Sequence, residues 1–246
     1  MTQFKMKYEI IQDYIRIGNA RSGQKLNGVH FLVAHDIGNG ASTAYNNRSY
    51  FNNQQPLASA HTFIDDKHIL EIVPLDEKAW HVQYNTTNDN KLFGADANDV
   101  AIGAELCWGG KINFQEAYRR FVWYHAYLCW KFNLDPTKHI VSHKILDPQR
   151  RSDPDNALNK NGLTYEQFLK DVKNEYDDCL RLESDENMKL TLNEWKMLGD
   201  SIDGWYRKGL ISDYKWAEKA YKQEITLSEL TWLNAIVFTR KNGIKV

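Results

Sequence analysis

The sequence of 246 residues is 42% hydrophobic and 13% aromatic, which is enough for one large folded domain and a small one. Its formal net charge of -1 provides no basic field, so a nucleic-acid partner is not expected. The N-terminal residues lack the apolar stretch of a signal peptide, and no segment approaches the roughly 20 apolar residues of a membrane span. We therefore expect a globular protein without membrane insertion, which stays cytoplasmic until something else releases it.

Three short apolar runs bounded by turn-forming residues predict buried strands, at residues 29–34, 69–74 and 100–107. Between residues 113 and 132 the large apolar side chains recur every three or four positions, which predicts a helix. Asn113 and Glu116 have the spacing of a capping box at its start, and Asp135-Pro136 should stop it. Strands and helices thus alternate, which favours an α/β domain with a central mixed β-sheet flanked by helices.

An acidic segment over residues 177–187 marks the expected domain boundary. We predict a first domain over residues 1–178, a linker over 179–188 and a small all-α domain over 189–246. Two capping-box spacings and two apolar stripes indicate about three helices in the second domain. The capping pairs are Thr191 with Glu194 and Thr226 with Glu229, and the stripes are Leu192, Trp195, Leu198, Ile202 and Trp205, then Leu227, Leu230, Leu233 and Val237.

Two histidines follow apolar runs in a similar way. His35 comes directly after residues 29–34, His143 follows residues 139–142, and Asp153 lies ten residues later in a turn-rich segment. Two imidazoles and one carboxylate are a ligand set of catalytic zinc, which keeps a fourth position open for water or substrate. The spacing does not establish such a site, because a histidine at a strand end is more often a structural or surface residue.

Other polar residues have two interpretations each. Glu105 lies in an otherwise apolar run, where an ionised carboxylate is costly unless it has a partner or a task, but an edge strand could also turn it outward. His61, Trp80 and His81 are equally compatible with packing roles, and Arg151 with a solvated charge. The cysteines form no CxxC pair, so we expect them to be reduced and mostly buried.

Five blocks in order resemble the type 2 N-acetylmuramoyl-L-alanine amidases. This family also includes bacteriophage lysozyme-type amidases and the animal peptidoglycan recognition proteins. The blocks are HDIGNGAS at 35, ASAHTFIDD at 58, AWHV at 79, IGAELCW at 102 and SHKILDPQRRSDPDNAL at 142. They cover most of residues 28–158, so the resemblance is far more specific than one motif.

The resemblance implies that His35, His143 and Asp153 bind Zn²⁺ at the strand ends, with Asp153 at a position that is Cys in some relatives. It implies that Glu105 is the general base that acts on the attacking water. Arg151 falls where many relatives have Lys and some have Thr. Arginine can stabilise an oxyanion, but it cannot shuttle protons at neutral pH.

The expected activity is therefore that of a zinc-dependent amidase, which hydrolyses the amide between N-acetylmuramic acid and L-alanine in bacterial peptidoglycan. His61, Trp80 and His81 resemble groove-lining positions and are expected to contact substrate or support the site. The lack of a signal peptide fits a phage or prophage endolysin. The helical tail resembles C-terminal segments of some phage amidases, and its excess of Lys and Arg would favour anionic secondary wall polymers. A stabilising appendage or a dimer surface is the alternative role for this tail.

Three other functions stay open at this point. A non-catalytic peptidoglycan-binding protein of the same fold is one, although here all three ligand positions are filled. A muramidase with paired carboxylates would need no metal, so chelation would distinguish it. A Cys/His endopeptidase built on Cys107 would be inactivated by alkylation.

Overall fold

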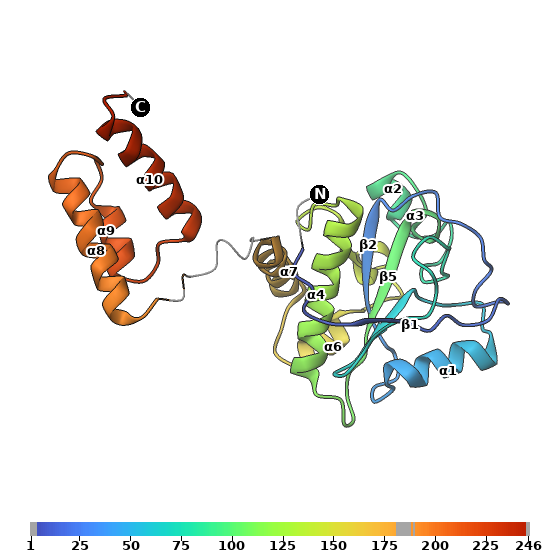
Figure 1. Cartoon of the computed structure of the whole chain (residues 1–246). Coiled ribbons are helices and arrows are strands. Elements are labelled where there is room, and N and C mark those ends of the chain that lie inside the picture. Colours follow the sequence, from blue (N-terminus) through green and yellow to red (C-terminus); the bar gives the residue numbers. More distant parts are fainter. Residues whose placement is uncertain (1–3, 181–187, 189, 245–246) are drawn as a thin grey trace. The chain divides into compact units, whose positions relative to one another are not determined.

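The computed structural model describes residues 4–180, 188 and 190–244, and the chain divides into two compact units. The larger unit is Phe4–Cys179, and the smaller contains the chain from Leu180 onward. Strands and helices alternate along the larger unit (Figure 1). The strands are β1 (Ile10–Gln12), β2 (Phe31–Asp36), β3 (Thr62–Ile64), β4 (Ile69–Glu71), β5 (Ala101–Leu106) and β6 (Ile140–Ser142). The helices are α1 (Ala44–Gln54), α2 (Asp89–Phe93), α3 (Ala97–Val100), α4 (Phe114–Phe132), α5 (His143–Leu146), α6 (Asp155–Lys160) and α7 (Tyr165–Leu180).

The strands form one six-stranded sheet in the order β1-β4-β3-β5-β2-β6. Strands β3 and β4 pair antiparallel, and all the other pairs are parallel. This arrangement confirms the predicted central mixed sheet. Because β5, β2 and β6 are adjacent and parallel, their carboxyl ends meet at one edge, where loops can gather functional side chains.

The three predicted strands are present, but their ends differ from the prediction. The first begins at Phe31 and continues through His35 and Asp36, because both residues stay in register with β5 as far as Leu106. The second ends at Glu71, and in the third Val100 belongs to α3. A prediction from hydrophobicity ends a strand at its first polar residue. In the structure, backbone hydrogen bonds with β5 extend β2 by two more residues.

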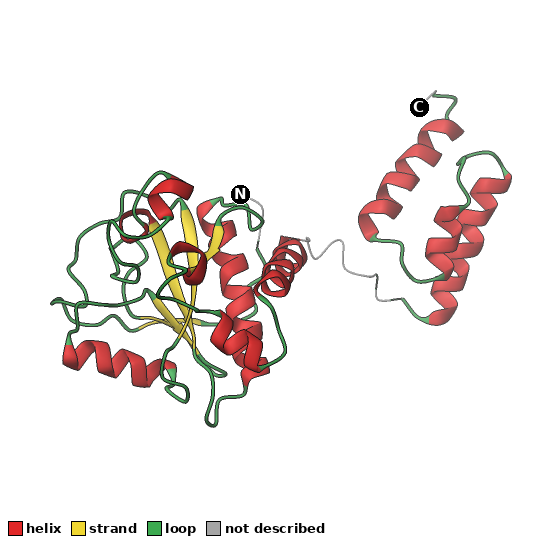
Figure 2. Ribbon diagram, turned by 180° about the vertical axis from the view of Figure 1, so that it is seen from behind, coloured by secondary structure: helices red, strands yellow, loops and turns green. Residues whose placement is uncertain are grey.

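The two faces of the sheet have different partners, because successive side chains of a strand point to opposite sides. On one face, Thr62 of β3 bonds Tyr124 of α4 through their hydroxyls at 2.8 Å. On the other face, Phe63 packs against Phe51 of α1. Both views place the strands between α1 and α4 (Figures 1 and 2). Glu105 pairs in register with Phe63, so its side chain lies on the face that α1 borders.

Helix α4 covers the predicted residues, but the expected capping box is only half formed, because the N–H of Asn113 donates to the carboxylate of Asp66 and not to Glu116. It begins after Asn113, whose side chain accepts a hydrogen bond from the backbone N–H of Glu116, as expected for an N-cap. It ends at Phe132, before Asp135-Pro136, because Asn133 adopts a left-handed conformation (φ 54°) and its N–H bonds back to the last turn. Its buried face includes Phe121, Tyr124 and Leu128, which fixes the helix on the sheet.

The smaller unit contains α8 (Leu192–Arg207), α9 (Lys215–Tyr221) and α10 (Leu227–Lys241). Both expected capping boxes are formed, at Thr191 and at Thr226. The buried core includes four stripe residues, Trp195, Ile202, Leu233 and Val237. Leu192 and Leu227 were expected on these stripes but are exposed, because each is the first residue of its helix and has no neighbouring turn to cover it.

Three remaining expectations concern the linker, the membrane and the cysteines. Helix α7 runs to Leu180, so residues 179–180 of the predicted linker are helical, while 181–187 lie outside the described residues. Among the helices of the described ranges, none is both long and apolar enough to cross a membrane. The cysteines are free and buried, as expected: Cys107, Cys129 and Cys179.

Candidate metal centre and active site

The register of three parallel strands brings the candidate residues together. His35 of β2 and Glu105 of β5 are direct partners, so their side chains stand next to each other on the same face. On the other side of β2, Ala34 pairs with Ser142 of β6, and His143 is the next residue. The Ser142 hydroxyl accepts a hydrogen bond from the N–H of Ile145, which starts α5 at His143. The hydrogen bonds that join β5, β2 and β6 thus bring residues from three distant segments of the sequence to the same edge of the sheet.

Asp153 completes a convergent group with the two histidines. The Nδ1 atoms of His35 and His143 lie 2.9 and 3.0 Å from the same Oδ2 atom of Asp153. Ligand atoms of the three residues all lie within 4.8 Å of one another, and all three residues are buried. Two ligand atoms of a tetrahedral zinc ion, each about 2.0–2.1 Å from the metal, are about 3.3 Å apart. The donor set and its spacing therefore fit a zinc ion.

The electrostatics of this group suit metal binding. Burial lowers the pKa of His35 to about 4, although the hydrogen bond with Asp153 acts in the opposite direction. Burial alone would raise the pKa of Asp153, but hydrogen bonds with His143 and His35 outweigh it and hold this pKa well below its ordinary range. At neutral pH His35 is thus a neutral imidazole and Asp153 an ionised carboxylate, the forms that bind a metal.

A second group of possible ligands, Glu175, Asp178 and Cys179, is different in character. The ammonium of Lys7 lies 2.7 Å from a carboxylate oxygen of Glu175 and 2.7 Å from one of Asp178. A positive charge is therefore already present among these acids, and the group gives no support for a metal site.

Glu105 has an unusual environment for a carboxylate. Its Oε2 atom is buried and has no hydrogen-bond partner among the described residues. Burial raises its pKa well above the ordinary value, the negative charges of Asp153 and Asp36 raise it further, and the guanidinium of Arg151 lowers it. A carboxylate with a raised pKa is a stronger base near neutral pH, so Glu105 is suited to proton transfer.

His81 supports the metal group from behind. Its Nδ1 atom lies 3.1 Å from Nε2 of His35, the ring nitrogen of His35 that faces away from Asp153. Such a hydrogen bond fixes the orientation of a metal-binding imidazole. The ring packs against the backbone at Gly103, where an added Cβ would lie only 2.6 Å from Cγ of His81. The absent side chain of Gly103 thus makes the space in which His81 can reach His35.

His61 belongs to the interior and does not line the cavity at the metal group. It is fully buried, and its Nδ1 accepts a hydrogen bond from the N–H of Gly103. Its Nε2 therefore carries the proton and donates to the carbonyl of Glu77 at 2.9 Å. Both nitrogens are satisfied inside the protein, so the expectation of substrate contact does not suit this placement. A supporting role, through Gly103 and His81, does suit it.

The other predicted residues line a cavity of about 350 Å³ at the metal group. Trp80 and Arg151 both contribute to its wall, together with Glu105 and the candidate ligands. The indole Nε1 of Trp80 donates to the carbonyl of Asn19, which holds the ring in place. The cavity therefore combines a possible metal centre, a base and a cation in one space.

Asp36 is a structural residue of the site that sequence reasoning missed. Its carboxylate accepts hydrogen bonds from the N–H of Ala157 (2.8 Å) and from the amide of Asn156 (3.1 Å), so it ties the segment that follows Asp153 to the end of β2. Burial raises its pKa to about 6, and these two hydrogen bonds act against that shift. The available signal was its position next to His35 in the first sequence block.

Comparisons with known proteins agree with this arrangement. The family model described as N-acetylmuramoyl-L-alanine amidase matches residues 25–156, more than half of the chain. N-acetylmuramoyl-L-alanine amidase BlyA of Bacillus subtilis (strain 168) is 35% identical over 152 residues, which cover 58% of this chain and 40% of BlyA. N-acetylmuramoyl-L-alanine amidase CwlL of Bacillus licheniformis is 29% identical over 143 residues, 55% of this chain and 39% of CwlL. The chain thus spans about two-fifths of the length of these relatives.

Among solved structures, the catalytic domain of XlyA superposes with a TM-score of 0.55 and 26% identity, over 67% of this chain and 99% of that domain. The Staphylococcus aureus hydrolase AmiA, solved in complex with its ligand, has a TM-score of 0.58 over 70% of this chain and 85% of its own, and at 20% identity it supports the fold alone. The matched family segment contains strands β2 to β6, the candidate ligands and Glu105. From this match, this chain belongs to the type 2 N-acetylmuramoyl-L-alanine amidase family.

Proposed function

We propose that this chain is a zinc-dependent N-acetylmuramoyl-L-alanine amidase, which hydrolyses the amide between N-acetylmuramic acid and L-alanine in bacterial peptidoglycan. The observation that carries the proposal is the convergence of two imidazole Nδ1 atoms and one carboxylate oxygen beside Glu105 in a single cavity. Membership of the amidase family supports the reaction and the substrate. Glu105 favours an enzyme over a non-catalytic receptor, because its buried Oε2 atom has no hydrogen-bond partner among the described residues and is available to take a proton.

His35, His143 and Asp153 would hold the zinc ion. When bound, zinc would supply a Lewis acid that polarises the amide carbonyl and lowers the pKa of a water molecule. Glu105 would take the proton of the attacking water and return it to the departing amine of L-alanine. The raised pKa of Glu105 serves both steps, because the carboxylate accepts the proton readily and the acid delivers it near neutral pH.

Arg151 would stabilise the negative charge that develops on the carbonyl oxygen, since its guanidinium shares the cavity with Glu105. Trp80 would contact the substrate from the same wall, and His81 would keep His35 in its orientation. Cys107 has no part in this mechanism, because it is fully buried and burial raises the pKa of its thiol well above the ordinary value.

We further propose the biological setting on the sequence resemblance to phage amidases. The enzyme would act as an endolysin, and the helices α8 to α10 would bind the wall or its anionic polymers. Lysis of Gram-positive cells by added protein, and binding of the chain to walls with and without their anionic polymers, would test these two statements. If the chain binds equally to walls with and without these polymers, a stabilising role remains for the three helices.

The reaction is tested on purified Gram-positive peptidoglycan by measuring free amines and reducing ends together. We expect free L-alanine amines without new reducing ends. Chelator should abolish their release, and Glu105→Gln should slow it by about 10²- to 10⁴-fold. New reducing ends would indicate a muramidase instead. Amine release that persists with chelator would contradict the zinc mechanism.

A further inference from the structure

Helix α10 of the smaller unit carries large apolar side chains on two opposite sides (Figure 1). On one side, Leu230, Leu233 and Val237 pack into the core that α10 shares with α8 and α9. On the other side, Trp232 and Phe238 are 53% and 69% exposed. Residues three or four positions apart share one side of a helix, so Ala235 lies between these two aromatic residues on the outward side of α10.

The outward side of α10 also lacks the charges that usually cover an exposed helix. At the surface of α8, two ion pairs join residues one turn apart, Lys196 with Asp200 and Asp203 with Arg207. In α10, by contrast, no charged residue occurs from Leu230 to Thr239. A helix that is apolar on both sides is normally covered on both. The outward side of α10 thus has the character of a contact surface.

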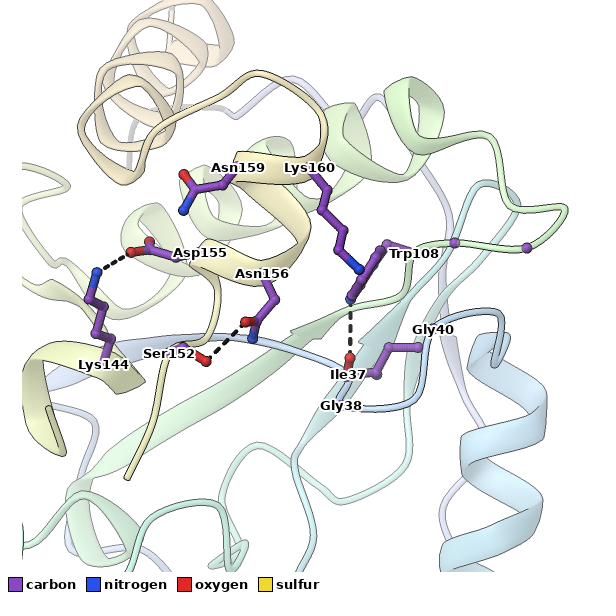
Figure 3. Close-up of a pocket in the computed structure, with 12 residues that line it drawn as sticks. Ile37, Gly38, Gly40, Trp108, Lys144, Ser152, Asp155, Asn156, Asn159 and Lys160 are labelled. Carbon is purple, nitrogen blue, oxygen red and sulfur yellow. Dashed lines mark hydrogen bonds and ion pairs between the residues drawn. The ribbon is translucent and has the colours of Figure 1, made fainter. Parts of the chain in front are cut away.

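Trp232 differs in its contacts from a surface tryptophan of the larger unit. The indole Nε1 of Trp108 donates to the carbonyl of Ile37 at 3.1 Å, and the ammonium of Lys160 lies 4.7 Å from the ring centre of Trp108 (Figure 3). In the part of the chain that the structure describes, Trp232 makes no hydrogen bond through its indole, and its one ring contact is with Trp216 at 5.6 Å. More than half of Trp232 therefore remains accessible to a partner.

The side chains of this outward side are arranged almost symmetrically about Ala235. Trp232 and Phe238 lie three residues before and after it, and Thr231 and Thr239 lie four residues before and after it. When two such helices pack antiparallel, the large side chains of each copy can fit beside the small side chains of the other. The small Ala235 at the centre lets the two helices approach closely. The pattern is therefore complementary to itself.

The charges at the two ends of α10 favour the same antiparallel arrangement. Glu224 precedes the helix and Lys241 ends it; both are exposed, and neither has an ion-pair partner among the described residues. In an antiparallel pair, the acidic beginning of one copy lies near the basic end of the other, and the helix dipoles attract each other. An anionic polymer would instead require cations along the outward side, which the segment from Leu230 to Thr239 does not have.

We propose that the outward side of α10 is the interface of a symmetric dimer, in which a second copy of this chain packs antiparallel through Trp232, Ala235 and Phe238. A two-fold interface uses the same surface on both subunits, so it requires the self-complementary pattern found here. One pair of helices buries on the order of 1,000 Å², at the low end for specific complexes, so we expect a Kd on the order of 10–100 μM. This dimer does not depend on the amidase reaction. It would join two candidate active sites, so that wall binding by either copy keeps both near the peptidoglycan.

The first test is sedimentation velocity of the full-length protein over about 5 to 500 μM, a range that brackets the expected Kd. Phe238→Lys and Ala235→Lys each place a charge in the interface, opposite its own copy. Leu192→Lys is the matched control, because Leu192 is 77% exposed at the first position of α8. The wild type and the control should associate alike, and both α10 variants should raise Kd by at least about tenfold. Urea denaturation verifies that each variant is folded.

The second test uses single cysteines to determine the orientation of the two copies. Ala235→Cys should form a disulfide-linked dimer on mild oxidation, because the two-fold axis passes beside this residue. Ser228→Cys should not link to itself, because in an antiparallel pair the two copies of this exposed residue lie about 20 Å apart. The native cysteines are buried and should not react.

A wild type that is monomeric at every concentration would overturn the proposal, and so would α10 variants that associate like the control. Rapid linking of Ser228→Cys to itself would overturn the antiparallel arrangement. If the wild type is monomeric and Phe238→Lys loses binding to cell walls, the outward side of α10 binds a wall component, and the dimer is wrong. If the wild type is monomeric and Phe238→Lys unfolds at lower urea, this side is covered within the chain, and the dimer is again wrong.

Discussion

Replacing Gly103 by alanine is expected to disturb the metal group without touching any candidate ligand. The new Cβ would lie 2.6 Å from Cγ and 2.7 Å from Nδ1 of His81, closer than packed carbon atoms allow. His81 has little freedom to retreat, because its N–H donates to the side chain of Asn98 at 3.0 Å and its ring reaches His35. The ring must therefore tilt away or the strand β5 must shift.

The size of the effect follows from two contributions. Overpacking a filled site typically costs about 1–3 kcal/mol, and losing the hydrogen bond between His81 and His35 adds about 0.5–1.5 kcal/mol. We thus expect Gly103→Ala to lower the free energy of unfolding of the metal-free protein by about 2–4 kcal/mol. Loss of the support behind a metal-binding imidazole typically weakens metal affinity by about 10- to 100-fold.

Urea denaturation of the metal-free protein measures the first effect, and zinc competition with a chromogenic chelator measures the second. Gly38→Ala is the matched control, because an added Cβ there meets nothing within 4 Å. The control should unfold at nearly the wild-type urea concentration. If Gly103→Ala unfolds like the control and binds zinc as tightly as the wild type, the supporting role assigned to His81 is refuted.

Three other variants separate catalysis, metal binding and fold stability. Glu105→Gln should lower the rate of amine release by about 10²- to 10⁴-fold. Its urea midpoint should be no lower than that of the wild type, because the buried Oε2 atom that it replaces has no hydrogen-bond partner among the described residues. His143→Ala should reduce zinc bound after dialysis to well under one ion per chain by elemental analysis; retention of a full equivalent would show that the ligands lie elsewhere. Burial lowers the pKa of His125 to about 4 from an ordinary 6.5, so the unfolded chain binds the proton more strongly between these values. Wild-type stability should fall as pH decreases through this window, by up to about 3 kcal/mol from His125 alone, and His125→Leu should show a smaller fall in urea denaturation at pH 7 and pH 4.

Much of the fold could be predicted because its signals are local. The N-cap at Asn113, the two capping boxes and the apolar runs of β2 and β5 each depend on residues that are neighbours in sequence. Strand β1 gave no prediction, because the apolar run in it is only two residues long, Ile10 and Ile11, whereas β4 begins the longer run 69–74. The ends of β2 depended on pairing with β5, which no single segment contains.

The candidate site likewise has residues that the sequence could predict and features that depend on the packing of distant segments. His35, His143, Asp153 and Glu105 could be named from their positions after or within apolar runs and from the family resemblance. The burial of His61 and the space beside Gly103 could not, because both depend on how three strands and the segment of His81 pack together. Asp36 was not singled out, because its position next to His35 was a signal that two adjacent polar residues share, and it did not show which of the two side chains has a role in the site.

Titration of the metal-free protein with zinc, with amine release from peptidoglycan measured at each addition, tests the central claim most directly. We predict no activity without metal and a linear rise that ends at one zinc ion per chain, with no rise in a His143→Ala sample treated in the same way. Full activity in the metal-free protein, or an end point unrelated to one equivalent, would contradict a zinc amidase centred on His35, His143 and Asp153.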